Sequence, residues 1–219
     1  MEESGASDRA GAARWLTMHD DLLRGMAHAL SNRVGTILAV VSLLEIGESG
    51  AVQPIETLRL EADRLETLLQ TLRHLPRRTR QSLEPILPVD VARAAIELQA
   101  HHPDGRDVVC DVHLDGDMMP AWGDAASIEL AIAAALTGAK RHIATGVPVA
   151  VRISSTDDVV RFDVCGTIGG NAESERDLAL DASAAHWLVS ESGGRADTHA
   201  SGIVIELPAL AAIRRARKR

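Results

Sequence analysis

The chain has 219 residues, of which 46% are hydrophobic and 25% are charged, and its formal net charge is −8 at pH 7. This apolar fraction is sufficient for a folded core, and the length allows one domain or two. The negative charge argues against general affinity for nucleic acid. Cys110 and Cys165 belong to no CxxC pair, so we expect two reduced, buried thiols and no metal site.

No window reaches the roughly 18 unbroken apolar residues that are typical of a membrane span. The first residues, MEESGASDRAGAAR, contain no apolar stretch like that of a signal peptide. These residues, 1–14, are small and polar, and we expect them to be disordered. The expectation is therefore a cytoplasmic protein with no membrane segment.

The stretch Asp21–Leu44 lacks proline and carries apolar residues at helical spacing. When residues are placed about 100° apart, its apolar side chains gather opposite His28. They are Leu22, Leu23, Met26, Leu30, Val34, Ile37, Val41 and Leu44. His28 thus lies in a polar stripe, with Arg24 one turn before it and Asn32 one turn after it. Such a histidine is either a solvated surface residue or an exposed functional group.

A second helix is predicted from Pro54, a residue that suits the first helical turn. Its apolar residues alternate at intervals of three and four, as in a coiled-coil seam: Ile55, Leu58, Ala62, Leu65, Leu69 and Leu72. The short connection favours an antiparallel hairpin over residues 15–75. One hairpin leaves the apolar face of its first helix uncovered. Either the following domain or a second copy covers it, and we favour the second copy, which makes a dimeric four-helix bundle.

A linker is predicted at residues 76–88, with a proline at each end and the basic cluster Arg77, Arg78 and Arg80. Residues 89–210 alternate between helical and strand patterns. Helices are expected at 90–98, 128–136 and 180–189, with Asp90 as a candidate cap of the first and Asp124 and Ser127 as candidate caps of the second. Strands are expected at 108–114, 149–153, 159–164 and in a hairpin over 195–207. This order predicts an α+β fold with its helices on one face of a sheet. A frayed basic tail is expected at 211–219.

The run MAHALSNRVGTIL, residues 26–38, resembles the phosphoacceptor motif in the dimerisation domain of two-component histidine kinases. In that family an exposed histidine on the first hairpin helix is phosphorylated, and a polar residue lies four positions later. His28 and Asn32 match these two positions. Ala29 departs from the family, which usually carries an acidic residue there to assist the attack on ATP.

The second domain resembles the ATP-binding domain of the same kinases, through the segments GDAASIELAIAAALTGAKRH and LVSESGGRADTHASGIVIELP. The family's Mg²⁺- and ATP-binding positions are replaced. Ala134 and Gly138 stand at two asparagine positions, and Gly166 stands where an aspartate reads adenine; Gly169 and Gly170 remain from a glycine loop. Alanine and glycine side chains offer no oxygen to Mg²⁺. We therefore expect a degenerate ATPase-like sandwich that takes no cofactor.

The resemblance favours a histidine phosphotransferase that relays a phosphoryl group between receiver aspartates, with Mg²⁺ carried by the receiver. His28 would be the acceptor. Arg24 would offset phosphate charge, Asn32 would orient a water or a phosphoryl oxygen, and Ser31 and Gly35 would contact the partner.

The expected partners are response-regulator receiver domains, a hybrid histidine kinase and a second copy of the chain, with neither nucleic acid nor membrane. The alternatives are a non-catalytic scaffold that sequesters a receiver or a kinase and, less favoured, an active histidine kinase. Receiver phosphatase activity through Asn32 could coexist with phosphotransfer.

Overall fold

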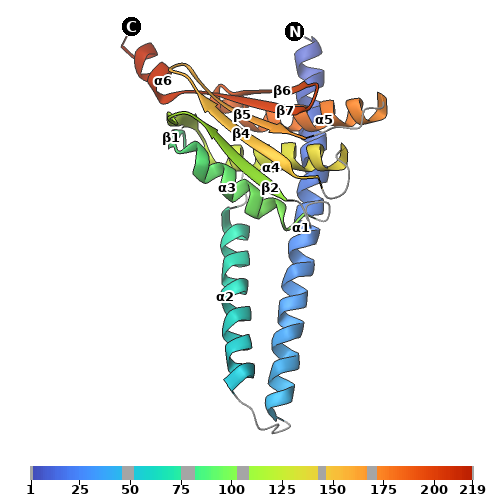
Figure 1. Cartoon of the computed structure of the whole chain (residues 1–219). Helices are drawn as coiled ribbons and strands as arrows, with labels where there is room; N and C mark the ends of the chain where they lie inside the picture. Colours follow the sequence, from blue (N-terminus) through green and yellow to red (C-terminus); the bar gives the residue numbers. More distant parts are fainter. Residues whose placement is uncertain are drawn as a thin grey trace.

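The computed structural model describes residues 2–45, 52–74, 82–102, 109–142, 147–166 and 172–218. Two long antiparallel helices, α1 (Glu2–Glu45) and α2 (Val52–His74), form a hairpin that projects from an α+β domain (Figure 1). Pro54 lies in the first turn of α2, as the sequence predicts. The expected α+β class with a helical N-terminal region is confirmed.

The second domain contains helices α3 (Pro88–Gln99), α4 (Ala125–His142), α5 (Ala172–Val189) and α6 (Leu210–Ala216), and the short 3-10 helix η2 (Ser190–Ser192). Its strands are β1 (Glu84–Ile86), β2 (Cys110–Asp115), β3 (Ala121–Gly123), β4 (Val149–Ser155), β5 (Val159–Cys165), β6 (Arg195–His199) and β7 (Gly202–Pro208). The main sheet has the order β2-β4-β5-β7-β6, and only its β2–β4 pair is parallel. The strands expected from alternation are thus present, most of them a residue or two longer.

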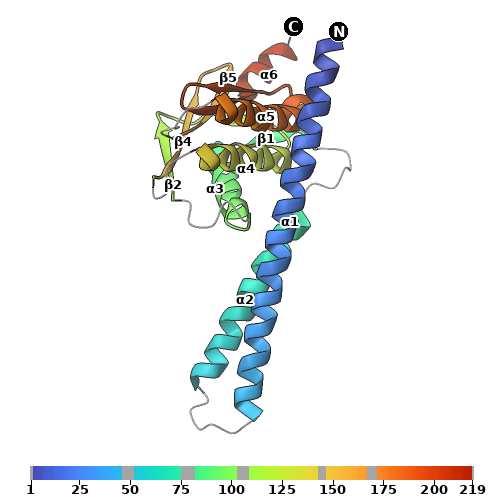
Figure 2. The same ribbon diagram turned by 90° about the vertical axis from the view of Figure 1, so that its right-hand side faces the viewer.

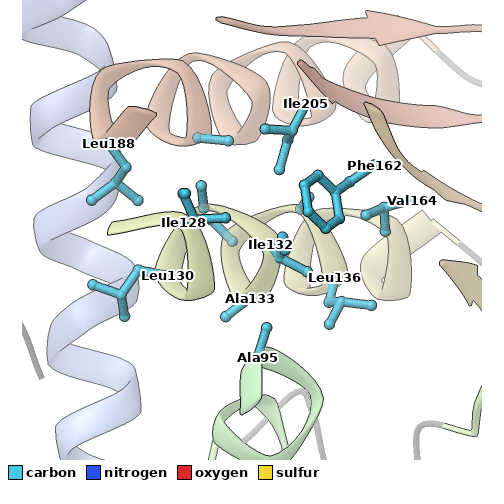
Figure 3. Close-up of a cluster of buried hydrophobic side chains, with 14 of the residues drawn as sticks. Ala95, Ile128, Leu130, Ile132, Ala133, Leu136, Phe162, Val164, Leu188 and Ile205 are labelled. Atoms are coloured by element: carbon cyan, nitrogen blue, oxygen red, sulfur yellow. The ribbon is translucent and has the colours of Figure 1, made fainter. Parts of the chain in front are cut away.

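The core lies between this sheet and α4, where Phe162, Val164 and Ile205 point from the strands toward Ile132 and Leu136 (Figure 3). All five side chains are fully buried. Alanines of α3, α4 and α5 are buried where these helices pack. Their small side chains let the helices approach closely. The Asp124 carboxylate accepts from the Ser127 backbone N–H at 2.8 Å and caps α4 as expected.

Residues 1–14 were expected to be disordered, but α1 begins at Glu2. The N-terminal half of α1 runs alongside α5 (Figures 1 and 2), where Gly11, Trp15 and Met18 are buried. A Cβ atom on Gly11 would lie 2.4 Å from the backbone oxygen of Ser183 in α5. Glycine therefore permits the close approach of the two helices. Residues 2–14 are small and polar and show no helical pattern of their own. Burial of this part of α1 against α5 stabilises the helix.

Gly11→Ala is expected to lower the free energy of unfolding by about 1–3 kcal/mol, because the added methyl group overlaps the α5 backbone. Gly35, on the same helix, has nothing within 4 Å of its Cβ position. Gly35→Ala should therefore stabilise the protein by up to about 1 kcal/mol through helix propensity. Urea denaturation measures both variants. Equal effects of the two substitutions on the free energy of unfolding would contradict the packing of α1 on α5.

The predicted linker at residues 76–88 contains structure at its C-terminal end. Strand β1 pairs there with β3, and α3 begins at Pro88. Asp90 lies in the first turn of α3 and is not its cap, a position that Leu87 takes. Residues 76–81, with the three linker arginines, lie outside the described residues. The sequence missed β1 because three residues are too few to show a period.

The basic tail was expected to fray, but Leu210–Ala216 forms α6. The guanidinium of Arg215 donates to the carboxylate of Asp158, and the Arg217 guanidinium lies 5.1 Å from the ring centroid of Trp122. These contacts hold the tail on the domain. After α3, His102 is buried and His101 is half-buried. Cys110 and Cys165 are free and half-buried, and burial raises the pKa of Cys110 to about 11.

One helix segment, Asp8–Leu44, is long and apolar enough to span a membrane by length and composition, with a mean hydropathy of 1.3 in an 18-residue window. Only 6% of that window is buried within the structure, although Met18 and Met26 of the segment are themselves buried.

Candidate functional site

His28 and Asn32 lie together on the exposed side of α1. Nε2 of His28 is 3.2 Å from Nδ2 of Asn32. In this arrangement the amide N–H donates to the lone pair of Nε2, and Nδ1 carries the proton of the neutral imidazole, so this hydrogen bond must open before Nε2 can act as a nucleophile. With the amide turned over, Nε2–H would donate to Oδ1 and the lone pair of Nδ1 would be free. Asn32 therefore favours one tautomer of an exposed imidazole in each case.

The other predicted site residues do not contact this pair. The Arg24 side chain is 72% exposed, and its Nη1 donates to Oδ1 of Asp21 at 2.6 Å. The Ser31 hydroxyl donates to the backbone oxygen of Ala27 at 2.9 Å, and Gly35 leaves open space beside the helix. Arg24 and Asp21 together carry no net charge. Their pairing leaves little positive potential for an anion near His28.

A groove of about 430 Å³ adjoins Asn32, between α1, α2 and the end of α3. Asn32, Arg33 and Thr36 line it from α1, Glu61 lines it from α2, and His101 lines it from the turn after α3. Only Asn32 of these residues was singled out from the sequence. The groove exists because the hairpin and the second domain meet at this level of α1.

Glu61 is a buried carboxylate, 6% exposed, on the α1-facing side of α2. Its Oε2 accepts a hydrogen bond from Nη1 of Arg33 at 2.8 Å, and its Oε1 accepts one from Nη1 of Arg64 at 2.6 Å. The hydrogen bonds from Arg33 and then Arg64 lower the pKa of Glu61. Two guanidinium groups thus share one carboxylate, and the cluster keeps one net positive charge.

His101 faces this cluster from the second domain. Burial and, to a lesser extent, the charge of Arg33 lower the pKa of His101. Its neutral form is therefore favoured at neutral pH. Arg33 is the main cationic group that lines the groove.

The positions that resemble the nucleotide site of kinases lie in the packed layer of α4 and α5. Ala134 is fully buried, and a Cβ atom on Gly138 would lie 2.8 Å from Oδ2 of Asp181. Asp181 is itself fully buried, and its Oδ1 accepts from Nε of Arg14 at 2.6 Å. Burial raises the pKa of Asp181 despite this bond. Asp181 of α5, held by Arg14 of α1, thus fills the space beside Gly138.

Gly166 directly follows β5, and its backbone N–H donates to the backbone oxygen of Ser201 at 3.0 Å. Gly169 and Gly170 lie outside the described residues. Within the described ranges, no three His, Cys, Asp or Glu side chains form a group that could hold a metal ion.

No family model and no curated protein matches the sequence. Among solved structures, the chain is similar to the Acinetobacter baumannii histidine kinase AdeS, with 17% identity, a TM-score of 0.48, and coverage of 84% of this chain and 98% of that one. It is also similar to the mycobacterial sensor histidine kinase MprB, with 21% identity, a TM-score of 0.44, and coverage of 58% and 98%. A structure titled as a bacterial phosphotransferase has 15% identity, a TM-score of 0.43, and coverage of 87% and 95%.

Proposed function

We propose that the chain is a cytoplasmic histidine phosphotransferase of a two-component phosphorelay, with His28 as the phosphoacceptor. The observation that carries the proposal is an exposed imidazole whose Nε2 lies 3.2 Å from the side-chain amide of Asn32. A ring nitrogen with its lone pair free attacks the phosphorus of a receiver's aspartyl phosphate. A bond forms between nitrogen and phosphorus, the bond between phosphorus and the carboxylate oxygen breaks, and the free aspartate leaves. The receiver supplies the Mg²⁺, and the reverse reaction passes the group to a second receiver.

Receivers, rather than ATP, are the proposed source of the phosphoryl group. Ala29 cannot accept a proton beside His28, and Ala134, Gly138 and Gly166 have no side-chain oxygen for Mg²⁺ or adenine. Aspartyl phosphate is an activated acyl phosphate, so it needs little help from the acceptor protein. The proposed partners are response-regulator receivers and a hybrid histidine kinase.

The test is to incubate the chain with receiver domains that carry labelled aspartyl phosphate and, separately, with ATP labelled on its γ-phosphate. We expect receivers to transfer label to the chain and ATP to transfer none. Label from ATP would indicate an active kinase. Stable binding of a phosphorylated receiver without any transfer would instead indicate a scaffold.

We infer that the hairpin forms a homodimer, since one face of it stays uncovered within a single chain. Leu38 of α1 is 61% exposed, and Ile55 and Leu69 of α2 are 56% and 45% exposed. Ile55 and Leu69 occupy alternate positions of the predicted seam, whose intervening Leu58 and Leu65 are half-buried. A second copy would cover the exposed half of the seam.

Sedimentation at about 10 μM, a concentration typical for a test of moderate affinity, should therefore give the mass of two chains. Leu38→Glu should shift the protein toward one chain, because it places a charge in the apolar contact. Gly35→Ala, one turn away, is the control. A wild-type monomer at this concentration would contradict the dimer.

A further inference from the structure

We propose that the second domain carries a docking patch for an anionic lipid surface, built by β1, β3 and α6. The inference does not depend on the proposed function of His28. The patch has an apolar row, Leu83, Pro85 and Leu87, and a cationic cluster, Arg214, Arg217 and Lys218.

The apolar row lies along one side of β1. Alternate residues of a strand point to the same side, and Leu83, Pro85 and Leu87 are all exposed, whereas Ile86 between them is buried. Leu83 is 39% exposed and Leu87 is 57% exposed. Pro85 lies directly opposite Trp122 in the antiparallel pair of β1 and β3, so the indole borders the row. Exposed apolar side chains that gather in this way mark a contact surface.

The cationic cluster lies beside this row. The Arg217 guanidinium is 5.1 Å from the ring centroid of Trp122, which joins α6 to the apolar row. Arg214, Arg217 and Lys218 are exposed, and within the described residues no carboxylate forms an ion pair with them. Arg215, in contrast, is paired with the two aspartates of the turn between β4 and β5. Three cations of this region are therefore available to an anion.

A lipid surface fits both parts of the patch. Leucine and tryptophan side chains enter the boundary between headgroups and acyl chains, while arginine and lysine bind anionic headgroups. Nucleic acid would use the cations but leave the leucines in water. The net charge of −8 does not prevent binding, because charges farther apart than about 8 Å are largely screened at physiological ionic strength. The expectation of no membrane partner rested on the absence of a spanning stretch, which does not exclude a peripheral contact.

The position of the patch is compatible with a free hairpin. Helix α6 lies at the end of the molecule opposite the tip of the α1–α2 hairpin (Figure 1). Binding through α6 therefore leaves the hairpin, with its exposed His28, accessible from solution.

The test is cosedimentation of the full chain with vesicles of phosphatidylcholine alone and of phosphatidylcholine mixed with phosphatidylglycerol. We expect binding to the mixed vesicles only, weakened by added salt. Arg214→Ala combined with Lys218→Ala should weaken it about 25-fold, or about fivefold for each cation. Arg59→Ala combined with Arg152→Ala is the matched control, because it removes the same charge from exposed positions on α2 and β4. This control should stay within about twofold of wild type.

Leu87→Ser tests the apolar row. It should weaken binding to the mixed vesicles about tenfold by removing apolar contact, and it should not destabilise the fold, because residue 87 is the N-cap of α3 and serine suits that position. Three results would overturn the inference: no binding to the mixed vesicles, equal loss in the two double variants, or unchanged binding in Leu87→Ser. Binding of a DNA oligonucleotide that needs Arg214 and Lys218 but not Leu87, without vesicle binding, would instead assign the cluster to nucleic acid.

Discussion

His28→Ala is expected to abolish label transfer from phosphorylated receiver domains, a loss of at least about a hundredfold, because the variant lacks the nucleophile. Its fold should be unaffected. His28 is exposed on the side of α1 away from buried Leu22 and Met26, so removing the ring should change the free energy of unfolding by no more than about 0.5 kcal/mol. Labelling, urea denaturation and sedimentation of the same preparation test whether activity and stability separate at this residue.

His113→Ala is the matched control, because His113 is also an exposed histidine but lies on β2 of the second domain. It should be labelled at the wild-type rate. Asn32→Ala should retain the acceptor and mainly change how fast a receiver loses its phosphate, since it removes only the amide that lies 3.2 Å from Nε2 of His28. Persistent label on His28→Ala would mean that another histidine is the acceptor.

Arg14→Ala should have the largest effect on stability among the variants considered, a loss of about 3 kcal/mol in the free energy of unfolding. Arg14 of α1 donates at 2.6 Å to Asp181 of α5, whose carboxylate is fully buried. Arg141 lies farther away, with 3.6 Å between its Nη1 and Oδ1 of Asp181. Removing Arg14 therefore leaves a buried carboxylate without its closest cation, and the packing of α1 on α5 is weakened.

Arg24→Ala serves as the control for this stability prediction. It removes an arginine from the same helix, but its partner Asp21 lies on the exposed surface. An exposed pair of this kind contributes about 0–1 kcal/mol. The free energies of unfolding of the two variants, measured by urea denaturation, should differ clearly. A loss of under 1 kcal/mol for Arg14→Ala would show that burial of the Asp181 carboxylate does not depend on Arg14.

Local patterns were enough to predict the hairpin, most helices and strands of the second domain, and the placement of His28 and Asn32 on one face of the first helix. Helical spacing places residues 28 and 32 on one face whatever surrounds the helix. Alternation of apolar residues likewise predicts β4 and β5, since one face of the sheet is buried. These features depend on neighbours within a few positions, and so they can be read from the chain directly.

Contacts between distant residues could not be predicted in this way. Arg14 and Asp181 are 167 positions apart, and Arg33 and Glu61 are 28 apart. The helical state of residues 2–14 follows from how α1 lies against α5, and the filled space beside Gly138 follows from how α5 lies against α4. The groove next to Asn32 forms where α1, α2 and the turn after α3 meet. Each depends on which surfaces become buried together, and no local period of the sequence carries that information.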